Sequence, residues 1–295
     1  MPLLDKLREQ YGVGPLCSEL HIAPSTYYHC QQQRHHPDKR SARAQRDDWL
    51  KKEIQRVYDE NHQVYGVRKV WRQLLREGIR VARCTVARLM AVMGLAGVLR
   101  GKKVRTTISR KAVVAGDRVN RQFVAERPDQ LWVADFTYVS TWRGFVYVAF
   151  IIDVFAGYIV GWRVSSSMET TFVLDALEQA LWARRPSGTV HHSDKGSQYV
   201  SLAYTQRLKE AGLLASTGST GDSYDNAMAE SINGLYKAEV IHRKSWKNRT
   251  EVELATLTWV DWYNNRRLLE RLGHTPPAEA EKAYYASIGN DDLAA

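Results

Sequence analysis

Three acidic residues stand where a carboxylate has a chemical use. Asp135 lies inside the otherwise apolar run WVADFTYV, where a carboxylate is costly unless it is paired or binds a cation. Asp194 follows the strand-like end of SGTV by a few residues, and Glu230 stands near the start of a helical pattern. If the three acids converge, their hard oxygen atoms suit Mg²⁺ or Mn²⁺. Two such ions about 4 Å apart can activate an attacking oxygen and stabilise the leaving oxygen of a phosphodiester.

The elements that carry these acids predict an α/β fold with a mixed sheet flanked by helices. Three apolar runs are joined by short turns, which indicates an antiparallel meander; they are 131–140, 144–153 and 158–165. Helical and strand patterns then alternate along 168–184, 188–192, 201–212, 213–217 and 225–241. This order is ribonuclease-H-like. It brings the acids from the first strand, a later strand end and the last helix to one edge of the sheet.

The neighbours of the acids add further candidates. Lys237 follows Glu230 by two helical turns, where it can meet a DNA backbone, and Gly234 leaves room for a strand to approach. Gly196 lets the backbone turn beneath Asp194. His191 and His192 could be metal ligands, but a contact to a neighbouring strand or to substrate is favoured. Because successive strand residues alternate, we expect one of the two histidines to face the site.

The ordered motifs WVADFTY, HSDKGSQY and DNAMAES, with 35 residues between Asp194 and Glu230, resemble those of the Asp-Asp-Glu transposases and retroviral integrases. With YGVRKVWRQL and RLMAVMGL upstream, the chain is similar to the second-frame product (OrfB) of insertion elements of the IS-three family. The resemblance covers roughly residues 10–285. It implies that Asp135, Asp194 and Glu230 are the catalytic, metal-binding triad, with two Mg²⁺ or Mn²⁺ ions. It also implies DNA cleavage and strand transfer without a covalent enzyme intermediate, a homo-multimer and, in many members, a first-frame protein partner.

The positive charge is concentrated upstream of the acids. Residues 61–120 carry 14 Lys and Arg against 2 Asp and Glu, although the whole chain has a net charge of only +10. Such a concentration indicates a polyanion partner, here double-stranded DNA. Helical patterns at 47–60, 65–78 and 83–95 in the same region predict a helix-turn-helix unit, and a weaker one covers 3–29. A small helical bundle with incidental arginines is the alternative.

The expected DNA contacts fall in three places besides Lys237. They are Arg83, Thr85 and Arg88 on the last helix of that unit, Lys102, Lys103 and Arg105 in a basic linker, and Arg266 and Arg267 in the tail. Leu269 departs from the family pattern, because similar tails often carry a histidine there. That departure weakens a direct DNA contact at Leu269.

The predicted division of the chain has five parts. They are a helix-turn-helix-like segment with a polar linker at 1–45, a helix-turn-helix domain at 46–100, the basic linker at 101–127, the catalytic core at 128–245 and a helical tail at 246–295. The longest apolar run, 145–152, is far shorter than the roughly 18 residues of a membrane helix, and the N-terminus has no signal pattern. We therefore expect a cytoplasmic, nucleoid-associated bacterial protein.

Two other interpretations of function stay open. A nuclease or junction resolvase on the same fold would cut DNA without joining a 3′-hydroxyl end to a target. A catalytically silent DNA-binding regulator would keep the helical domains and lose the acids' chemistry. Cys17, Cys30 and Cys84 form no CxxC pair, so reduced thiols are expected. The alternative is a zinc site formed by Cys17, His21, Cys30 and His35 or His36.

Overall fold

The computed structural model describes residues 2–99, 124–194, 196–217 and 227–294. The α-helices are α1 (Pro2–Tyr11), α2 (Val13–Glu19), α3 (Pro24–His35), α4 (Ala42–Glu60), α5 (Val67–Arg76), α6 (Arg83–Met93), α7 (Thr170–Arg184), α8 (Leu202–Glu210), α9 (Ala227–Glu239), α10 (Arg249–Asn265) and α11 (Pro277–Ala294). The strands are β1 (Leu131–Thr141), β2 (Gly144–Asp153), β3 (Ile159–Ser165), β4 (Val190–Ser193) and β5 (Leu214–Thr217). Short 3₁₀ turns are η1 (Pro37–Lys39), η2 (Ile241–Arg243) and η3 (Glu270–Leu272).

The strands form a mixed sheet in the order β3-β2-β1-β4-β5. β1, β2 and β3 are an antiparallel meander, because the turns between them are short. β4 and β5 are reached through helices and run parallel to β1. Strand order and directions are those of the ribonuclease-H-like fold, which confirms the predicted fold class.

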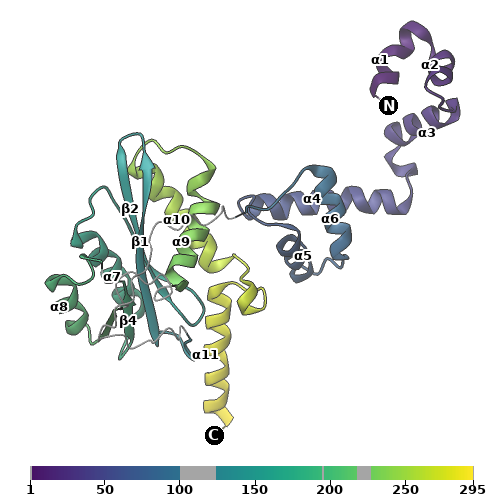
Figure 1. Cartoon of the computed structure of the whole chain (residues 1–295). Helices are drawn as coiled ribbons and strands as arrows, with labels where there is room; N and C mark the ends of the chain where they lie inside the picture. The colour runs from purple at the N-terminus through teal and green to yellow at the C-terminus, as the bar shows by residue number, and fades with distance from the viewer. Residues whose placement is uncertain (1, 100–123, 195, 218–226, 295) are drawn as a thin grey trace, which may run out of the picture.

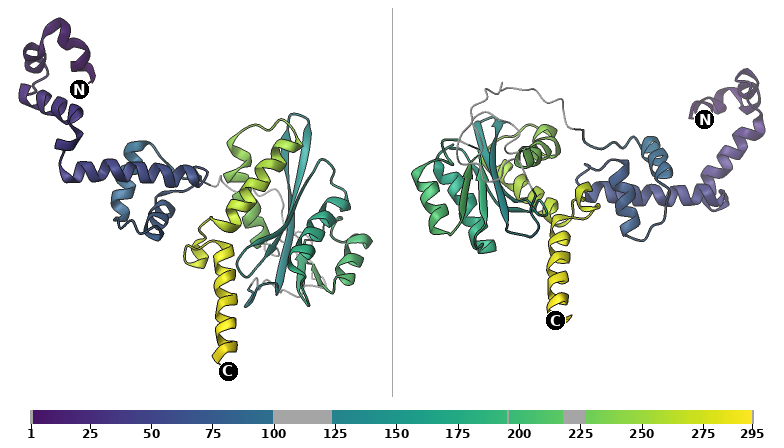
Figure 2. Two further views of the ribbon diagram at one scale, coloured as in Figure 1. Left: turned by 180° about the vertical axis from the view of Figure 1, so that it is seen from behind. Right: turned by 60° about the horizontal axis from the view of Figure 1, so that its bottom comes forward.

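Helices cover both faces of this sheet (Figures 1 and 2). On one face α7 and α8 pack over a core that includes Trp132, Phe172 and Leu177. On the other face α9 and α10 pack over a second core that includes Phe150, Tyr236 and Trp259. Alternation along the strands explains the two cores, since Trp132 and Val133 point to opposite faces.

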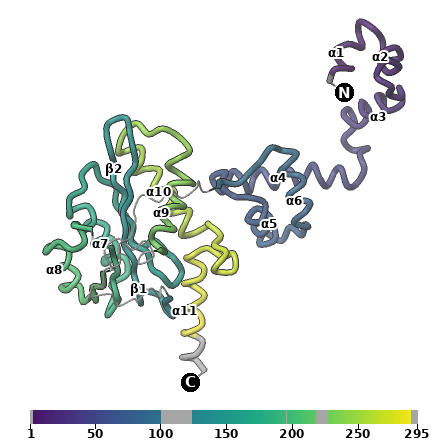
Figure 3. Tube along the Cα trace, in the orientation of Figure 1, coloured from purple at the N-terminus to yellow at the C-terminus, as the bar shows by residue number. Residues whose placement is uncertain are grey.

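The N-terminal region is helical and extends away from the sheet, as the trace in Figure 3 shows. The helices α4, α5 and α6 pack around Leu50, Ile54 and Val86. Here the polar linker predicted in residues 31–45 was wrong in part, because α3 continues to His35 and α4 already begins at Ala42. The Ser41 hydroxyl caps α4 by accepting the Ala44 N–H at 3.2 Å.

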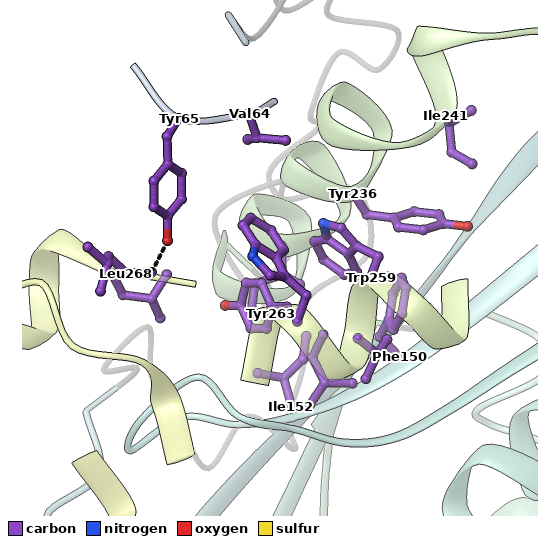
Figure 4. Packing of buried hydrophobic residues seen from close by; sticks show 14 of the residues in the cluster. Val64, Tyr65, Phe150, Ile152, Tyr236, Ile241, Trp259, Tyr263 and Leu268 are labelled. Atoms are coloured by element: carbon purple, nitrogen blue, oxygen red, sulfur yellow. Dashed lines mark hydrogen bonds between the residues drawn. The ribbon is translucent and has the colours of Figure 1, made fainter. Parts of the chain in front are cut away.

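The α4–α6 unit contacts the C-terminal tail of the chain directly. The Tyr65 hydroxyl accepts the backbone N–H of Leu268 at 2.8 Å (Figure 4). It also donates to the Arg266 carbonyl at 3.3 Å. The indole N–H of Trp262 donates to Asn61 Oδ1 at 3.1 Å. One apolar cluster therefore runs from the helical unit into the face of the sheet covered by α9 and α10. No helix in the described ranges is both long and apolar enough to cross a bilayer.

Candidate active site

The pairing of β1 with β4 sets the positions of the two aspartates. The parallel register joins Ala134 to Ser193, so Asp135 and Asp194 follow at the same level of neighbouring strands. Neighbouring strands lie about 4.8 Å apart. Asp135 still belongs to β1, whereas Asp194 is the first residue after β4 and is exposed. The two aspartates therefore lie at the same level and on the same face of neighbouring strands.

Asp135 is held by two hydrogen bonds. The Phe136 N–H donates to Oδ1 at 2.8 Å, and the Asn233 amide on α9 donates to Oδ2 at 2.9 Å. Burial raises the pKa of Asp135 to about 7, the negative charge of Asp194 and, more weakly, Glu230 adds to the rise, and the two donors oppose it. Asp135 therefore stands in an environment that disfavours its charged form until a cation is supplied.

Asp194 is positioned by the turn that follows it. The Gly196 N–H donates to Asp194 Oδ1 at 3.0 Å. A Cβ atom at residue 196 would lie 3.0 Å from that oxygen and 3.4 Å from Gln198 Oε1, which is tighter than ordinary contacts. A side chain at residue 196 would therefore require the Asp194 carboxylate to shift by a few tenths of an ångström.

Glu230 reaches the same region from the first turn of α9. Ile232 and Tyr236 bury one side of this helix against the sheet, and that packing turns Asn233 toward Asp135. Asn233 is not among the residues that the sequence predicts for the site. Its signal in the sequence was the i, i+3 spacing from Glu230, but the contact depends on how α9 is rotated against β1.

The charges of the three acids act on one another, yet the side chains are not gathered into a ligand cluster. Over the ranges that the structure describes, no group of three or more His, Cys, Asp and Glu side chains is spaced to hold a metal ion. The donor set still fits a divalent cation chemically, since two carboxylates adjoin and one of them has a raised pKa.

His191 and His192 are interior residues rather than site ligands. His191 Nε2 lies 3.1 Å from the Tyr204 hydroxyl of α8, and burial lowers the pKa of His191 to about 4. His192 Nδ1 lies 3.0 Å from Ser216 Oγ on the neighbouring strand β5, the kind of contact that we favoured. Strand pairing sets the two histidines on opposite faces of the sheet: His192 pairs with Val133 and so shares the face of Asp135, whereas His191 pairs with Trp132 on the other face. Both rings are buried.

The predicted DNA contacts on α6 lie at the surface of the helical unit. Arg83 is exposed and Thr85 is half-buried. The exposed Arg88 guanidinium is paired with Asp47 at 2.9 Å. Such exposed pairs contribute little stability, so Arg88 can exchange Asp47 for a phosphate at small cost.

The other predicted contacts divide into three groups. Lys102, Lys103 and Arg105 lie outside the described residues. The Lys237 ammonium lies 5.2 Å from the ring centre of Tyr138, which follows Asp135 by three residues on β1. The tail arginines are considered separately below.

Arg266 and Arg267 differ sharply in exposure. Arg266 is exposed and its guanidinium lies 3.2 Å from Glu60. The Arg267 side chain is only 5% exposed and pairs with Glu239, itself 4% exposed. Arg267 as a DNA contact is therefore wrong for this structure: its guanidinium is committed to a buried ion pair that joins the tail to α9.

A cavity of about 630 Å³ opens away from the acids, between the end of α4 and α10. Its wall includes His62, Arg243, Trp246 and Trp259. None of the three acids lines it, so the chemistry and this cavity are separate features.

Known proteins resemble the chain over its whole length. An HTH-like domain matches residues 45–103, and two models described as integrase core domain match residues 125–223 and 211–277. The transposase for insertion sequence element IS629 of Shigella sonnei is 98% identical over 295 residues, which is 100% of both chains. The chain belongs to the insertion-element transposases. DNA transposition by an enzyme with an integrase-type catalytic domain, as predicted, is confirmed.

More distant relatives agree with this assignment. A putative transposase for IS986/IS6110 of Mycobacterium tuberculosis is 54% identical over 273 residues, covering 90% of this transposase and 96% of that protein. Among solved structures, a chain of the simian T-cell lymphotropic virus intasome in complex with the PP2A regulatory subunit B56 gamma covers 77% of this chain and 74% of its own. Its sequence identity is 13% and its TM-score 0.45, so the family assignment rests on the sequence relatives alone.

Proposed function

We propose that this transposase cuts and joins insertion-element ends by direct transesterification at Asp135, Asp194 and Glu230. The observation that supports the proposal most strongly is the β1–β4 register, which sets Asp135 beside Asp194 at one sheet edge. Glu230 acts on the pKa of Asp135 from α9, so all three acids share one electrostatic environment.

The three carboxylates would hold one or two Mg²⁺ or Mn²⁺ ions. When bound, the metal supplies Lewis acidity to the attacking and leaving oxygens of a phosphodiester. Asp135 would be one of the carboxylates that hold the metal, and Asn233 would keep that carboxylate in orientation. Gly196 keeps the Asp194 carboxylate turned through its N–H. Without metal, the raised pKa of Asp135, about 7, allows this carboxyl to hold a proton beside the other acids.

DNA would be held by the helical unit and by cations around the acids. We propose contacts from Arg83, Thr85 and Arg88 on α6, from the basic segment with Lys102, Lys103 and Arg105, and from Lys237 and Arg266. The concentration of positive charge in residues 61–120 supports this arrangement. A homo-multimer that pairs two element ends, a first-frame protein partner, the OrfB assignment and the division into five parts belong to the same proposal.

The decisive experiment is a strand-transfer assay. Purified protein would be incubated with labelled element-end DNA, a target plasmid and Mn²⁺ or Mg²⁺. The Asp194→Asn variant and a chelator should abolish joined products. Asp175→Asn, which changes an exposed carboxylate of α7 paired with Arg163, should leave them unchanged.

The same assay separates the alternatives. Cleavage without joining would support a nuclease, and DNA binding without either reaction, even with the first-frame protein added, would support a regulator. Strand transfer that persists in Asp194→Asn would contradict the triad.

A further inference from the structure

The tip of the β1–β2 hairpin extends beyond the rest of the sheet. β3 pairs with β2 only up to Tyr147, and β4 pairs with β1 only up to Ala134. Residues 138–146 therefore form a two-stranded ribbon with no further strand beside it in the described parts of the chain. Figure 1 shows the hairpin projecting at one end of the sheet, next to the start of α10.

This ribbon exposes three large aromatic side chains. Tyr138 is 60%, Trp142 72% and Phe145 57% exposed. The Tyr138 and Phe145 rings meet edge to face with centres 5.6 Å apart, so they form one surface. Adjacent exposed aromatic rings, unlike apolar residues scattered singly, indicate a binding surface.

Cations stand over the same rings. The Lys237 ammonium lies 5.2 Å from the Tyr138 ring centre, and the Lys247 ammonium lies 6.0 Å from that of Trp142. Arg143 is exposed at the turn between the strands. Among the described residues none of these three cations is in an ion pair, whereas the nearby Lys244 is neutralised by Glu251 at 2.8 Å.

The position of Trp142 is fixed by the backbone. Its N–H donates to the carbonyl of Trp246 at 3.0 Å, which ties the hairpin turn to the segment before α10. Thr141 Oγ1 donates to the Gly144 carbonyl at 2.7 Å and closes the turn. These two hydrogen bonds hold the turn that lies between the aromatic residues in a fixed position.

The surface begins about 10 Å along β1 from the acids. Tyr138 follows Asp135 by three residues, so strand alternation turns its side chain to the opposite face. Lys237 follows Asn233, which bonds Asp135, by one turn of α9, and its ammonium reaches the Tyr138 ring in the part of β1 that β4 no longer pairs. A DNA strand that passes from the acids over this unpaired edge of β1 would meet Tyr138 first and then Phe145 and Trp142.

We propose that Tyr138, Trp142 and Phe145 form a stacking surface for unpaired nucleotides next to the reacting phosphodiester. Unpaired bases stack on exposed aromatic rings whatever their sequence, while the neighbouring cations attract the backbone. A continuous duplex hides its base faces and would use only the cations. This inference rests on the proposed function and adds single-stranded DNA as a substrate feature that the site recognises.

The test is a binding titration of the full chain with labelled oligonucleotides, with chelator present so that no reaction takes place. One oligonucleotide is a blunt duplex and the other carries a few unpaired nucleotides at its end. Stacking loss weakens binding by about fivefold to a hundredfold per base. Trp142→Ala and Phe145→Ala should each weaken binding of the tailed DNA by about tenfold and of the blunt duplex by less than twofold. Trp142→Phe should restore most of the affinity for tailed DNA.

Trp182→Ala is the matched control, because Trp182 is 82% exposed on α7 and lies on another element. Equal losses for tailed and blunt DNA, or losses no larger than for Trp182→Ala, would overturn the proposal. A changed oligomeric state with unchanged DNA affinity would also overturn it and would make the hairpin a contact between copies of the chain. Because the titration needs no catalysis, its failure is distinct from failure of the strand-transfer assay.

Discussion

Asp135 is costly to bury in its charged form, and it is also a proposed metal ligand. It sits in an apolar strand beside two other acids, and burial together with their charges raises the pKa of its carboxyl to about 7. The folded protein therefore keeps a proton on Asp135 at pH values where the unfolded chain, with a pKa near 3.8, has released it. The contribution of Asp135 to the stability of the folded state is therefore fully present below about pH 4, and it is lost as pH rises through about 7.

Asp135→Asn should therefore change how stability depends on pH. The uncharged amide removes the repulsion, and the Asn233 amide can turn over to present its oxygen to the new NH₂ group. We expect the variant and the parent to have similar Tm values near pH 4, with the variant several degrees more stable at pH 8. Thermal unfolding in the presence of chelator measures this. Asp153, whose pKa burial also raises to about 7, is unchanged in both proteins and gives a common background. Parallel Tm curves from pH 4 to pH 8 would contradict the assignment.

Asn233 is the residue that holds the Asp135 carboxylate in place. Asn233→Leu fits the buried position but removes the donor 2.9 Å from Oδ2. Loss of a group that orients a metal ligand costs about 10- to 100-fold in metal affinity, so the Mn²⁺ concentration for half-maximal strand transfer should rise by that factor. The pH at which activity appears should also rise, because a lost donor raises the pKa of Asp135 further. Asn265→Leu, at the exposed end of α10, is the control. An unchanged metal requirement would leave Asn233 with a packing role only.

At the scale of elements, the strands and helices around the acids followed from sequence patterns, and their mutual rotations did not. Three apolar runs joined by short turns predicted the meander, and the helical pattern at 201–212 predicted α8. Pattern alone could not show that Arg267 is buried, because an arginine in a basic cluster is normally exposed. It also could not reveal the end of α3, since QQQRH has no apolar face to give a helical period. Those features depend on partners far away in the chain.

The Arg267–Glu239 pair fixes the tail to α9. The Arg267 Nε donates to both Glu239 oxygens at 3.1 and 3.2 Å, and the Trp259 indole N–H donates to the same carboxylate at 3.0 Å. Glu239→Gln would leave a buried guanidinium uncompensated, at a cost of about 3–5 kcal/mol. We expect a Tm lower by many degrees in thermal unfolding.

The double variant Glu239→Gln, Arg267→Met is the informative comparison, since it removes the uncompensated charge. It should recover much of the loss. If the double variant loses as much Tm as Glu239→Gln alone, or more, the pair contributes through packing and not through charge.

At the scale of the whole molecule, the helical unit contacts the tail directly. The bonds from Tyr65 and Asn61 to the region of Trp262 and Leu268 connect residues about two hundred positions apart. Sequence patterns have no access to such contacts, which is why we expected separate domains. The attachment gives the α6 surface and the acids a set separation, and a fixed separation would define where an element end is cut once α6 has bound.

Tyr65→Phe tests that attachment. The change leaves the buried Leu268 N–H without its acceptor at 2.8 Å, at a cost of about 1–3 kcal/mol that falls on the contact between the two units. We expect faster limited proteolysis between the units, a larger radius of gyration in solution scattering and less uniform cleavage positions at element ends. Tyr58→Phe is the matched control, because the Tyr58 hydroxyl donates to the Ala96 carbonyl at the same 2.8 Å but within the helical unit. If both variants behave alike, the Tyr65 bond stabilises its own unit and does not set the distance between DNA recognition and the acids.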